Sequence, residues 1–396
     1  MQTIFCRHNH LSSQRSDSFL KHKVEIWSEE TSPYGGVGTA LDEIIFGLSH
    51  CNYEIRLVTN LKKETRLPDI SGYSTKNVNG KMGPFAFVWY GILNKSKTVL
   101  ILNDVRSIYS YGVLSFLRLA AKKQLVVVNI HGSEIDRFLK NVNFKRRVLL
   151  YPFFMKVALT RSHRINCVSK FLKNKFLSEM KNLKIKIDEN KCKTFYIGAE
   201  YFSKTSEEIR PDIQDVIQSA RSRNMTIIVS AGRMDNKKGY PSMIEIFRHL
   251  PSNKFLWIVC GGVGKDSEII KRKLEKTGCH YYLTGNISRG MLSNIYRKSD
   301  LFWLLSDYDE GFGLSWYEAL LCGLKVIGRP RGALPEFIGS ETGFLSENND
   351  EISSFLCNYD SSLTTSTTRL ENEIQSNYQS FLPLGVDGMC DLSRKA

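Results

Sequence analysis

The clearest guide to the architecture of this chain is residues 301–328, which read LFWLLSDYDEGFGLSWYEALLCGLKVIG. An apolar run of strand length, Leu301–Leu305, is followed by acidic and glycine-rich turn residues, a helical pattern over Gly313–Cys322 and a second apolar run, Lys325–Gly328. A strand, a helix and a strand in this order form a βαβ unit. The stretch therefore predicts a doubly wound sheet, which binds ligands beyond the carboxyl ends of its strands.

The same alternation extends over most of the chain. Further strands are predicted at Lys23–Ser28, Val99–Leu102, Leu125–Ile130, Arg164–Cys167, Thr226–Ser230, Phe255–Val259 and Tyr281–Leu283. Further helices are predicted around Leu41–Leu48 and at Phe144–Thr160, Tyr240–His249, Ser267–Lys276 and Arg289–Arg297.

Length and polarity divide this alternation into two units. A chain of 396 residues is too long for one ordinary core, and the polar stretch Ser203–Asp215, with Pro211, is typical of a linker. We therefore expect an α/β protein with two doubly wound, Rossmann-like domains, residues 1–203 and 204–372. A tail at about residues 373–396 is expected to pack back on the first domain.

The excess positive charge is confined to the first half of the chain. Residues 1–200 hold 32 Lys and Arg against 16 Asp and Glu, whereas residues 201–396 hold 23 against 24. Within the first half, the stretch Lys140–Lys193 holds 15 basic and 3 acidic residues. This asymmetry predicts that the first domain faces an anionic partner.

Composition argues against a secreted or membrane-spanning protein. No apolar run approaches the roughly 20 residues that cross a bilayer, and the first ten residues lack the apolar core of a signal peptide. The nine cysteines are scattered singly, without a Cys-x-x-Cys pair, which is typical neither of a disulfide framework nor of a zinc site. We expect a cytoplasmic protein.

The turn after Leu305 carries the strongest functional signal. Glu310 and Glu318 are separated by seven residues, and Gly311-Phe312-Gly313 follows the first glutamate directly. The glycines allow close backbone approach, and the N–H groups of Phe312 to Leu314 are expected to point outward from a helix N-terminus. Such a site suits an anionic or hydroxyl-rich ligand, and Glu318 could accept hydrogen bonds from a vicinal diol such as ribose.

Downstream, Ala319–Ile327 and Gly332–Glu336 complete a pattern that resembles the signature of glycosyltransferase family 4, among the retaining GT-B enzymes with an E-x7-E motif. The resemblance implies the GT-B fold, with two Rossmann-like domains facing each other across a cleft. It implies that Glu310 contacts the donor sugar at the catalytic centre, that Glu318 contacts the donor ribose, and that the residues from Gly311 to Leu314 lie at the donor.

A second motif, Gly232-Arg233-Met234 followed by Lys237-Lys238-Gly239, begins the second domain. A diphosphate leaving group gains negative charge as the glycosidic bond breaks, and a guanidinium and an ammonium group can stabilise that charge. The spacing is similar to the Gly-Arg and Lys-Gly pair of the family, which implies that Arg233 and Lys238 bind the nucleotide diphosphate. Transfer is then expected to need no metal ion and no cofactor.

Two motifs of the first half also resemble the family. Tyr34–Gly38 is a glycine-rich turn that lacks the spacing of a dinucleotide site and the Lys-Ser/Thr of a P-loop. The resemblance implies that Gly36 and Gly38 reach the donor phosphate. His131 follows the predicted strand Leu125–Ile130; a lone histidine is more often structural, but the resemblance implies a catalytic contact with the donor sugar.

Two further patterns have simpler interpretations. Asp307-Tyr308-Asp309 matches the Asp-x-Asp that holds Mn²⁺ in the other major glycosyltransferase fold, but it adjoins Glu310 and is interpreted as loop acids. Gly261–Lys265 resembles a P-loop, but Asp266 stands where Ser or Thr is required. We interpret it as a strand-to-helix turn near the nucleotide.

Together these patterns favour a retaining glycosyltransferase that moves a sugar from a nucleotide diphosphate sugar to a hydroxyl of a glycan or lipid-linked saccharide. The resemblance points to bacterial surface polysaccharide synthesis. Another activity on the same fold, such as a sugar-nucleotide epimerase or a phosphorylase, is an alternative. A nucleic-acid-binding protein would account for the positive charge, but no RNA- or DNA-binding motif is present, so we expect no nucleic acid partner.

The sequence FKRRVLLYPFFMK at residues 144–156 mixes cations with bulky apolar side chains. An interfacial segment needs both, for anionic headgroups and for the acyl boundary. Resembling enzymes that build surface glycans often dock on the cytoplasmic leaflet through this domain. We therefore expect Lys145, Arg146 and Arg147 to face an anionic membrane, with the protein peripheral on the inner face of the cytoplasmic membrane. The alternative is a core helix with solvated lysines, and Pro152 argues against one smooth amphipathic helix.

Overall fold

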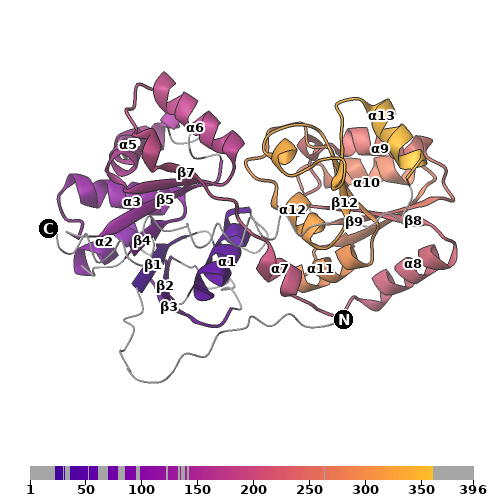
Figure 1. Cartoon of the computed structure of the whole chain (residues 1–396), viewed down its shortest axis with the longest axis horizontal. Helices are drawn as coiled ribbons and strands as arrows, with labels where there is room; N and C mark the ends of the chain where they lie inside the picture. Colours follow the sequence, from indigo (N-terminus) through magenta and orange to yellow (C-terminus); the bar gives the residue numbers. More distant parts are fainter. Residues whose placement is uncertain are drawn as a thin grey trace, which may run out of the picture.

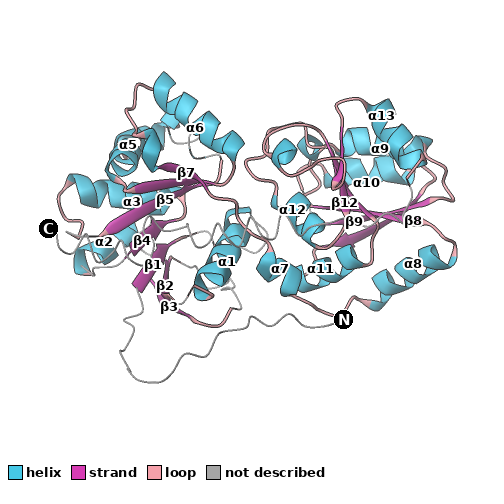
Figure 2. Cartoon of the chain, viewed as in Figure 1, coloured by secondary structure: helices cyan, strands magenta, loops and turns pink. Residues whose placement is uncertain are grey.

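Two parallel sheets, each with helices on both faces, make up the described part of the molecule (Figures 1 and 2). The computed structural model describes residues 23–29, 31, 36–51, 53–60, 70–78, 85–94, 99–121, 124–132, 134, 139–140, 142–262 and 264–359. None of the helices in these ranges is long and apolar enough to cross a bilayer. The tail predicted at residues 373–396 lies outside them.

The first sheet has the strand order β3-β2-β1-β4-β5-β6-β7, and all its neighbouring pairs are parallel. Its strands are β1 (Lys23–Trp27), β2 (Glu54–Thr59), β3 (Tyr73–Asn77), β4 (Val99–Leu102), β5 (Leu125–Ile130), β6 (Arg164–Cys167) and β7 (Cys192–Thr194). Its helices are α1 (Gly36–Ser49), α2 (Ala86–Leu93), α3 (Val105–Phe116), α4 (Phe144–Val148), α5 (Tyr151–Arg161) and α6 (Lys170–Asn182).

The second sheet has the strand order β10-β9-β8-β11-β12-β13, again parallel throughout. Its strands are β8 (Thr226–Ala231), β9 (Phe255–Cys260), β10 (His280–Gly285), β11 (Leu301–Leu304), β12 (Lys325–Gly328) and β13 (Gly343–Leu345). Its helices are α8 (Pro211–Ser222), α9 (Tyr240–His249), α10 (Ser267–Glu275), α11 (Arg289–Arg297), α12 (Leu314–Leu321) and α13 (Asn349–Cys357). A short helix, α7 (Glu200–Lys204), lies between the two units and contacts α1, α11 and α12.

Both sheets are doubly wound, as predicted. The winding direction reverses beside the first strand of each sheet, because β1 lies between β2 and β4, and β8 lies between β9 and β11. The strands β4, β8 and β9 are fully buried and, apart from Thr226 and Ser230 of β8, apolar, which suits strands covered on both faces. Ligands of such sheets bind beyond the carboxyl ends at the reversal. In the second sheet, the motifs after β8 and β11 meet there.

Two predicted elements differ from the structure. The single helix expected at Phe144–Thr160 is divided into α4 and α5, because Leu150 adopts a left-handed conformation (φ 54°) and Pro152, which has no N–H, stands in the first turn of α5. The expected linker at Ser203–Asp215 is shorter, because Pro211 begins α8 rather than interrupting a loop. That helix buries Ile213, Ile217 and Ala220 at helical spacing.

Candidate functional site

An ion pair joins the two strongest motifs of the second domain. Lys238 follows β8 and Glu310 follows β11, and Lys238 Nζ lies 2.5 Å from Glu310 Oε1. Both side chains are largely buried, at 17% and 16% exposed. Burial lowers the pKa of Lys238, but the Glu310 carboxylate and Tyr308 outweigh burial, so the pKa is raised overall. The ammonium group is therefore charged and held in one place.

Close backbone contact brings these two motifs together. Gly239, just after Lys238, has φ 82°, and a Cβ added there would lie 1.8 Å from the carbonyl oxygen of Leu305. Only glycine fits at this contact. The N–H of Asp307 also donates to the carbonyl of Lys237 at 2.9 Å. The loops after β8 and β11 thus form one unit, in which Lys238 must face Glu310.

The glycine turn after Glu310 reaches the first domain. A Cβ on Gly311 would lie 2.6 Å from the carbonyl oxygen of His131, and the Ser169 hydroxyl donates to the carbonyl of Gly311 at 2.5 Å. The structure therefore brings the predicted residues His131, Glu310, Gly311 and Lys238 into one region where the two domains meet.

His131 stands at the end of a row of buried asparagines. Its Nε2 lies 3.1 Å from Oδ1 of Asn103, which also accepts from Asn129 Nδ2 at 3.0 Å, while Asn166 Nδ2 donates to Asn129 Oδ1 at 3.4 Å. Because the Asn103 oxygen is an acceptor, Nε2 is the protonated nitrogen. Burial lowers the pKa of His131 below its usual 6.5, although Glu134 and Asp104 oppose the shift. The ring is therefore neutral and fixed in one tautomer.

In the turn from Gly311 to Leu314, the Phe312 side chain holds the turn in place, and the backbone is the part that could contact a ligand. The Phe312 ring is buried and packs against Tyr317 and Phe337, with ring centroids 5.3 and 5.2 Å apart. It anchors the turn, so any contact with a ligand would come from the backbone. Gly313 adopts φ 82° and is the N-cap of α12, so the first N–H groups of that helix begin at Leu314.

Glu318 belongs to a separate buried group. Its Oε1 accepts from Arg289 Nη1 at 2.8 Å, and Arg289 Nη2 donates to Glu43 Oε1 at 2.9 Å. Glu43 lies on α1 of the first domain and also accepts from the N–H groups of Tyr201 and Phe202. Burial raises the pKa of Glu318, and Arg289 opposes this shift. Sequence reasoning missed Glu43 and Arg289, since neither lies in a recognisable motif.

A second carboxylate crosses between the domains. Glu336 accepts from the N–H groups of Lys170 and Phe171, at 2.9 and 2.6 Å, and from the Tyr196 hydroxyl at 2.8 Å. The Glu336 carboxylate thus lies at the N-terminus of α6, where the helix dipole favours negative charge. Three residues earlier, the N–H of Ala333 donates to the carbonyl of Glu310. The segment after β12 therefore connects the Glu310 loop to the first domain.

The remaining predicted residues are more dispersed. Arg233 is exposed in the turn after β8, near the Lys238 loop in sequence. Gly36 and Gly38 lie in the first turn of α1, with Gly36 exposed and Gly38 buried; Tyr34 and Gly35 lie outside the described residues. The cations Lys145, Arg146 and Arg147 lie on α4, which has no buried residue.

The acids of the Asp-x-Asp pattern are both exposed. Asp307 Oδ1 lies 3.9 Å from Arg329 Nε, and the carbonyl of Asp307 accepts from Arg331. Across the ranges that the structure describes, no group of three or more His, Cys, Asp or Glu side chains is placed to hold a metal ion.

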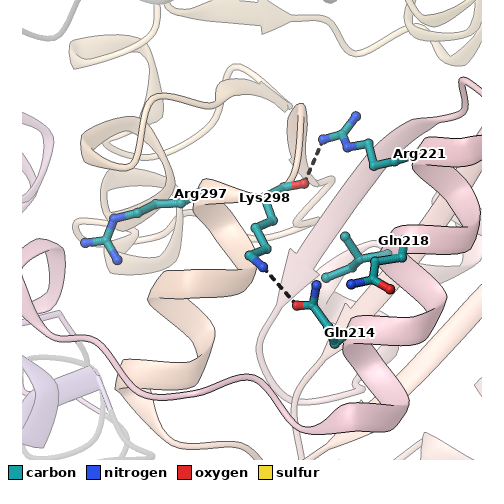
Figure 3. Close-up of a pocket in the computed structure, with 6 residues that line it drawn as sticks. Gln214, Gln218, Arg221, Arg297 and Lys298 are labelled. Carbon is teal, nitrogen blue, oxygen red and sulfur yellow. Dashed lines mark hydrogen bonds between the residues drawn. The ribbon is translucent and has the colours of Figure 1, made fainter.

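A pocket of the second domain lies apart from these residues (Figure 3). It is lined by α8 and the end of α11, and its cations are engaged locally: Arg221 with Asp300 at 2.7 Å, and Lys298 with Gln214 at 2.9 Å. It lies near the amino ends of β8 and β11, because Arg221 precedes β8 and Asp300 precedes β11. The predicted site is at the opposite ends of these strands.

Comparison with known proteins identifies the family of the second domain. Residues 213–363 match the family described as glycosyl transferases group 1. An uncharacterized glycosyltransferase of Methanocaldococcus jannaschii is 28% identical over 57% of this chain and 54% of that protein. The alpha-galactosylglucosyldiacylglycerol synthase of Streptococcus pneumoniae is 30% identical over 27% of this chain and 29% of that enzyme. The chain thus matches about half the length of the first relative and less of the second.

A solved structure extends the likeness to the whole fold. The crystal structure of Anabaena HepE in complex with UDP covers 94% of this chain and 98% of that chain, with a TM-score of 0.62 and 16% identity. The coverage takes in both sheets, so the predicted two-domain GT-B architecture is confirmed. Residues 213–363 are therefore a group 1 glycosyltransferase domain, in a chain with the GT-B fold.

Proposed function

We propose that this protein is a retaining glycosyltransferase that moves a sugar from a nucleotide diphosphate sugar to a hydroxyl of a lipid-linked saccharide. The observation that best supports the proposal is the buried Lys238–Glu310 pair, at the reversal of the second sheet and beside the His131 loop of the first domain. An ammonium for the phosphate and a carboxylate for the sugar hydroxyls stand together there. The complex of HepE with UDP supports a nucleotide donor of this class.

Each group has a role in the proposed transfer. The bond between the sugar C1 and the β-phosphate oxygen breaks, and the leaving diphosphate is stabilised by Lys238, Arg233 and the first N–H groups of α12. The acceptor oxygen forms its bond to C1 on the same face, and its proton passes to an oxygen of the leaving phosphate. Glu310 and the neutral His131 position the sugar hydroxyls. No covalent nucleophile is required.

Metal independence is part of the proposal, because Lys238 and Arg233 supply the charge that a metal ion would otherwise supply. Transfer should therefore continue at its full rate in excess EDTA. Loss of activity on chelation that Mn²⁺ or Mg²⁺ restores would instead assign Asp307 and Asp309 as ligands.

The acceptor is proposed to reach the enzyme at an anionic membrane surface. Most of the exposed large apolar side chains of the described residues lie on or beside helices α2 to α5 of the first domain: Phe85, Trp89, Leu93, Phe116, Leu117, Phe144, Val148, Leu150 and Phe153. α3 packs against both α2 and α5, so these side chains belong to one helical layer. We call them the apolar face.

Cations accompany the apolar face. Lys145 and Arg147 are exposed on α4, between Phe144 and Val148, which are 80% and 64% exposed. A peripheral membrane segment needs this combination of apolar area and positive charge. The pneumococcal relative is named as the synthase of a glycolipid, which also favours a lipid-linked acceptor, made for a bacterial surface polysaccharide on the inner face of the cytoplasmic membrane.

A two-step experiment tests the function. A panel of UDP, GDP and ADP sugars is first screened by thermal unfolding, since a ligand at 100 times its Kd adds about 2.7 kcal/mol of stability. The donor found is then incubated with the protein, with and without membrane lipid extracts. Label transferred to lipid, with the anomeric configuration of the donor retained, is the expected result. Turnover without any acceptor would favour an epimerase, and stabilisation by no sugar nucleotide would overturn the proposal.

A further inference from the structure

Arg289 occupies a position that the glycosyltransferase reaction described above leaves unused. It begins α11, where Ser288 is the N-cap, and its side chain is 15% exposed. Its two terminal nitrogens bind carboxylates of different domains, Glu318 of the second and Glu43 of the first. Its guanidinium carbon lies 4.9 Å from the centre of the Phe202 ring, on α7 between the domains. The side chain is therefore fixed on three sides.

The Arg289 contact leaves half of the Glu318 carboxylate available. Arg289 binds Oε1, whereas Oε2 has no hydrogen-bond partner among the described residues. A carboxylate held at one oxygen by a guanidinium can still accept hydroxyl hydrogen bonds at the other. Arg289 also opposes the effect of burial on Glu318, which would otherwise favour the neutral form and its weaker acceptor.

We propose that Arg289 is a positioning residue for the donor: it orients Glu318 so that one carboxylate oxygen faces the ribose, and it ties that carboxylate to Glu43 on α1. The inference rests on the proposed function, in which Glu318 binds the ribose. It adds that donor affinity depends on Glu43 of the first domain, which precedes Glu318 by about 275 positions in the chain. The donor itself would be held mainly by the second domain. Glu43 and Arg289 form the link.

The test measures how well the protein distinguishes ribose from deoxyribose. The tightest binder among UDP, GDP and ADP is compared with its 2′-deoxy and 3′-deoxy forms by titration calorimetry. The wild type should prefer the ribose form. In Arg289→Met, binding of the ribose form should weaken by about tenfold, the usual size for a charge-assisted hydrogen bond, while binding of the deoxy form that already lacks the Glu318 contact should change little.

Two variants guard against misfolding. Arg289→Lys keeps the charge but lacks the two terminal nitrogens that reach Glu318 and Glu43 separately, and it should show the same loss of discrimination. Arg221→Met is the matched control, because Arg221 is also paired at the opposite end of the sheet. It binds Asp300 and the carbonyl of Lys298 (Figure 3). The Arg221→Met variant should leave discrimination unchanged.

Glu43→Ala, which removes the acceptor of Arg289 in either protonation state, extends the test to the first domain. It should weaken binding of the ribose form in the wild-type background, and by less in Arg289→Met, because the two residues act through one link. Equal loss for the ribose and deoxy forms in the Arg289 variants would show a merely structural role and overturn the inference. A wild type that binds no nucleoside diphosphate would instead count against the proposed function, so the two failures are distinguishable.

Discussion

The two domains hold their charges differently. In the second domain, Lys238 is paired with Glu310 and Arg289 with Glu318, in buried positions at the carboxyl edge of the sheet. In the first domain, α4 presents Lys145 and Arg147 to solvent among exposed apolar side chains. A paired, buried cation is held in one geometry and suits a small ligand of fixed shape, whereas exposed cations suit a broad anionic surface. The comparison predicts different consequences when each set is removed.

The largest effect is expected at the buried pair. Lys238→Ala should lower the rate of sugar transfer by about 10²- to 10³-fold, the cost of losing one group that stabilises transition-state charge. Lys237→Ala is the control, because Lys237 is adjacent but exposed. Initial rates of sugar transfer at saturating donor measure the effect, and thermal unfolding confirms that both variants are folded. Similar transfer rates for Lys238→Ala and Lys237→Ala would show that the paired, buried cation matters no more than the exposed one.

A smaller effect is expected at the exposed cluster, and in a different assay. Replacing Lys145, Arg146 and Arg147 by Ser should weaken binding to anionic vesicles by about 100-fold, since each cation near such a surface contributes roughly 1 kcal/mol. Replacing the exposed Lys181, Lys184 and Lys186 removes the same charge away from the apolar face and should matter less. Vesicle flotation at low and high salt measures both. Equal recovery with neutral and anionic vesicles would contradict membrane docking.

Glu318→Gln should weaken binding of the nucleoside diphosphate by about tenfold, because the amide keeps one acceptor oxygen but loses the charge that strengthens its hydrogen bonds. Glu347→Gln is a suitable control, since Glu347 is paired with Arg331 on the surface of the same domain. Titration calorimetry measures both. Unchanged affinity in the Glu318 variant would rule out the ribose contact.

The smallest effect concerns pH. Burial raises the pKa of Glu43 from 4.5 to about 8; Arg289 opposes the shift and Glu318 adds to it. Between these values the folded protein holds a proton that the unfolded chain has released, so stability falls as pH rises through this window. Glu43→Gln cannot titrate, so its melting temperature should gain on the wild type by a few degrees from pH 5 to pH 8. The surface variant Glu54→Gln should show no such trend; a parallel trend in both would contradict the assignment.

Sequence patterns anticipated the second domain better than the first. A short apolar run bounded by turns located β12 without error, and helical periodicity located α9 and α11. These predictions succeeded because buried parallel strands and amphipathic helices have distinct periodicities. In the first domain β3 was missed, since its residues are mostly exposed and polar. The helix α3, which is capped by Asp104, was missed as well.

Within the candidate site, the spacing of Glu310, Gly311 and Lys238 was readable because these residues lie in local motifs. The contact between Arg289 and Glu43 was not readable, because it crosses between the domains. Glu336 lies in a recognised motif, but its contacts with the N-terminus of α6 also cross between the domains and were not readable. A contact between residues far apart in sequence leaves no periodic or local signal in one chain. Domain-to-domain contacts are therefore the part of the site that required the structure.

The segment from Gly332 to Glu336 couples the loop that carries Glu310 to the first domain. One end of it holds the backbone of Glu310 and the other holds the N-terminus of α6 in the opposite domain. Only two residues, Leu334 and Pro335, lie between these two attachments, so the two contacts are closely coupled. Separation of the domains is therefore expected to disturb the loop that carries Glu310. In the proposed transfer, product release and domain separation should occur together.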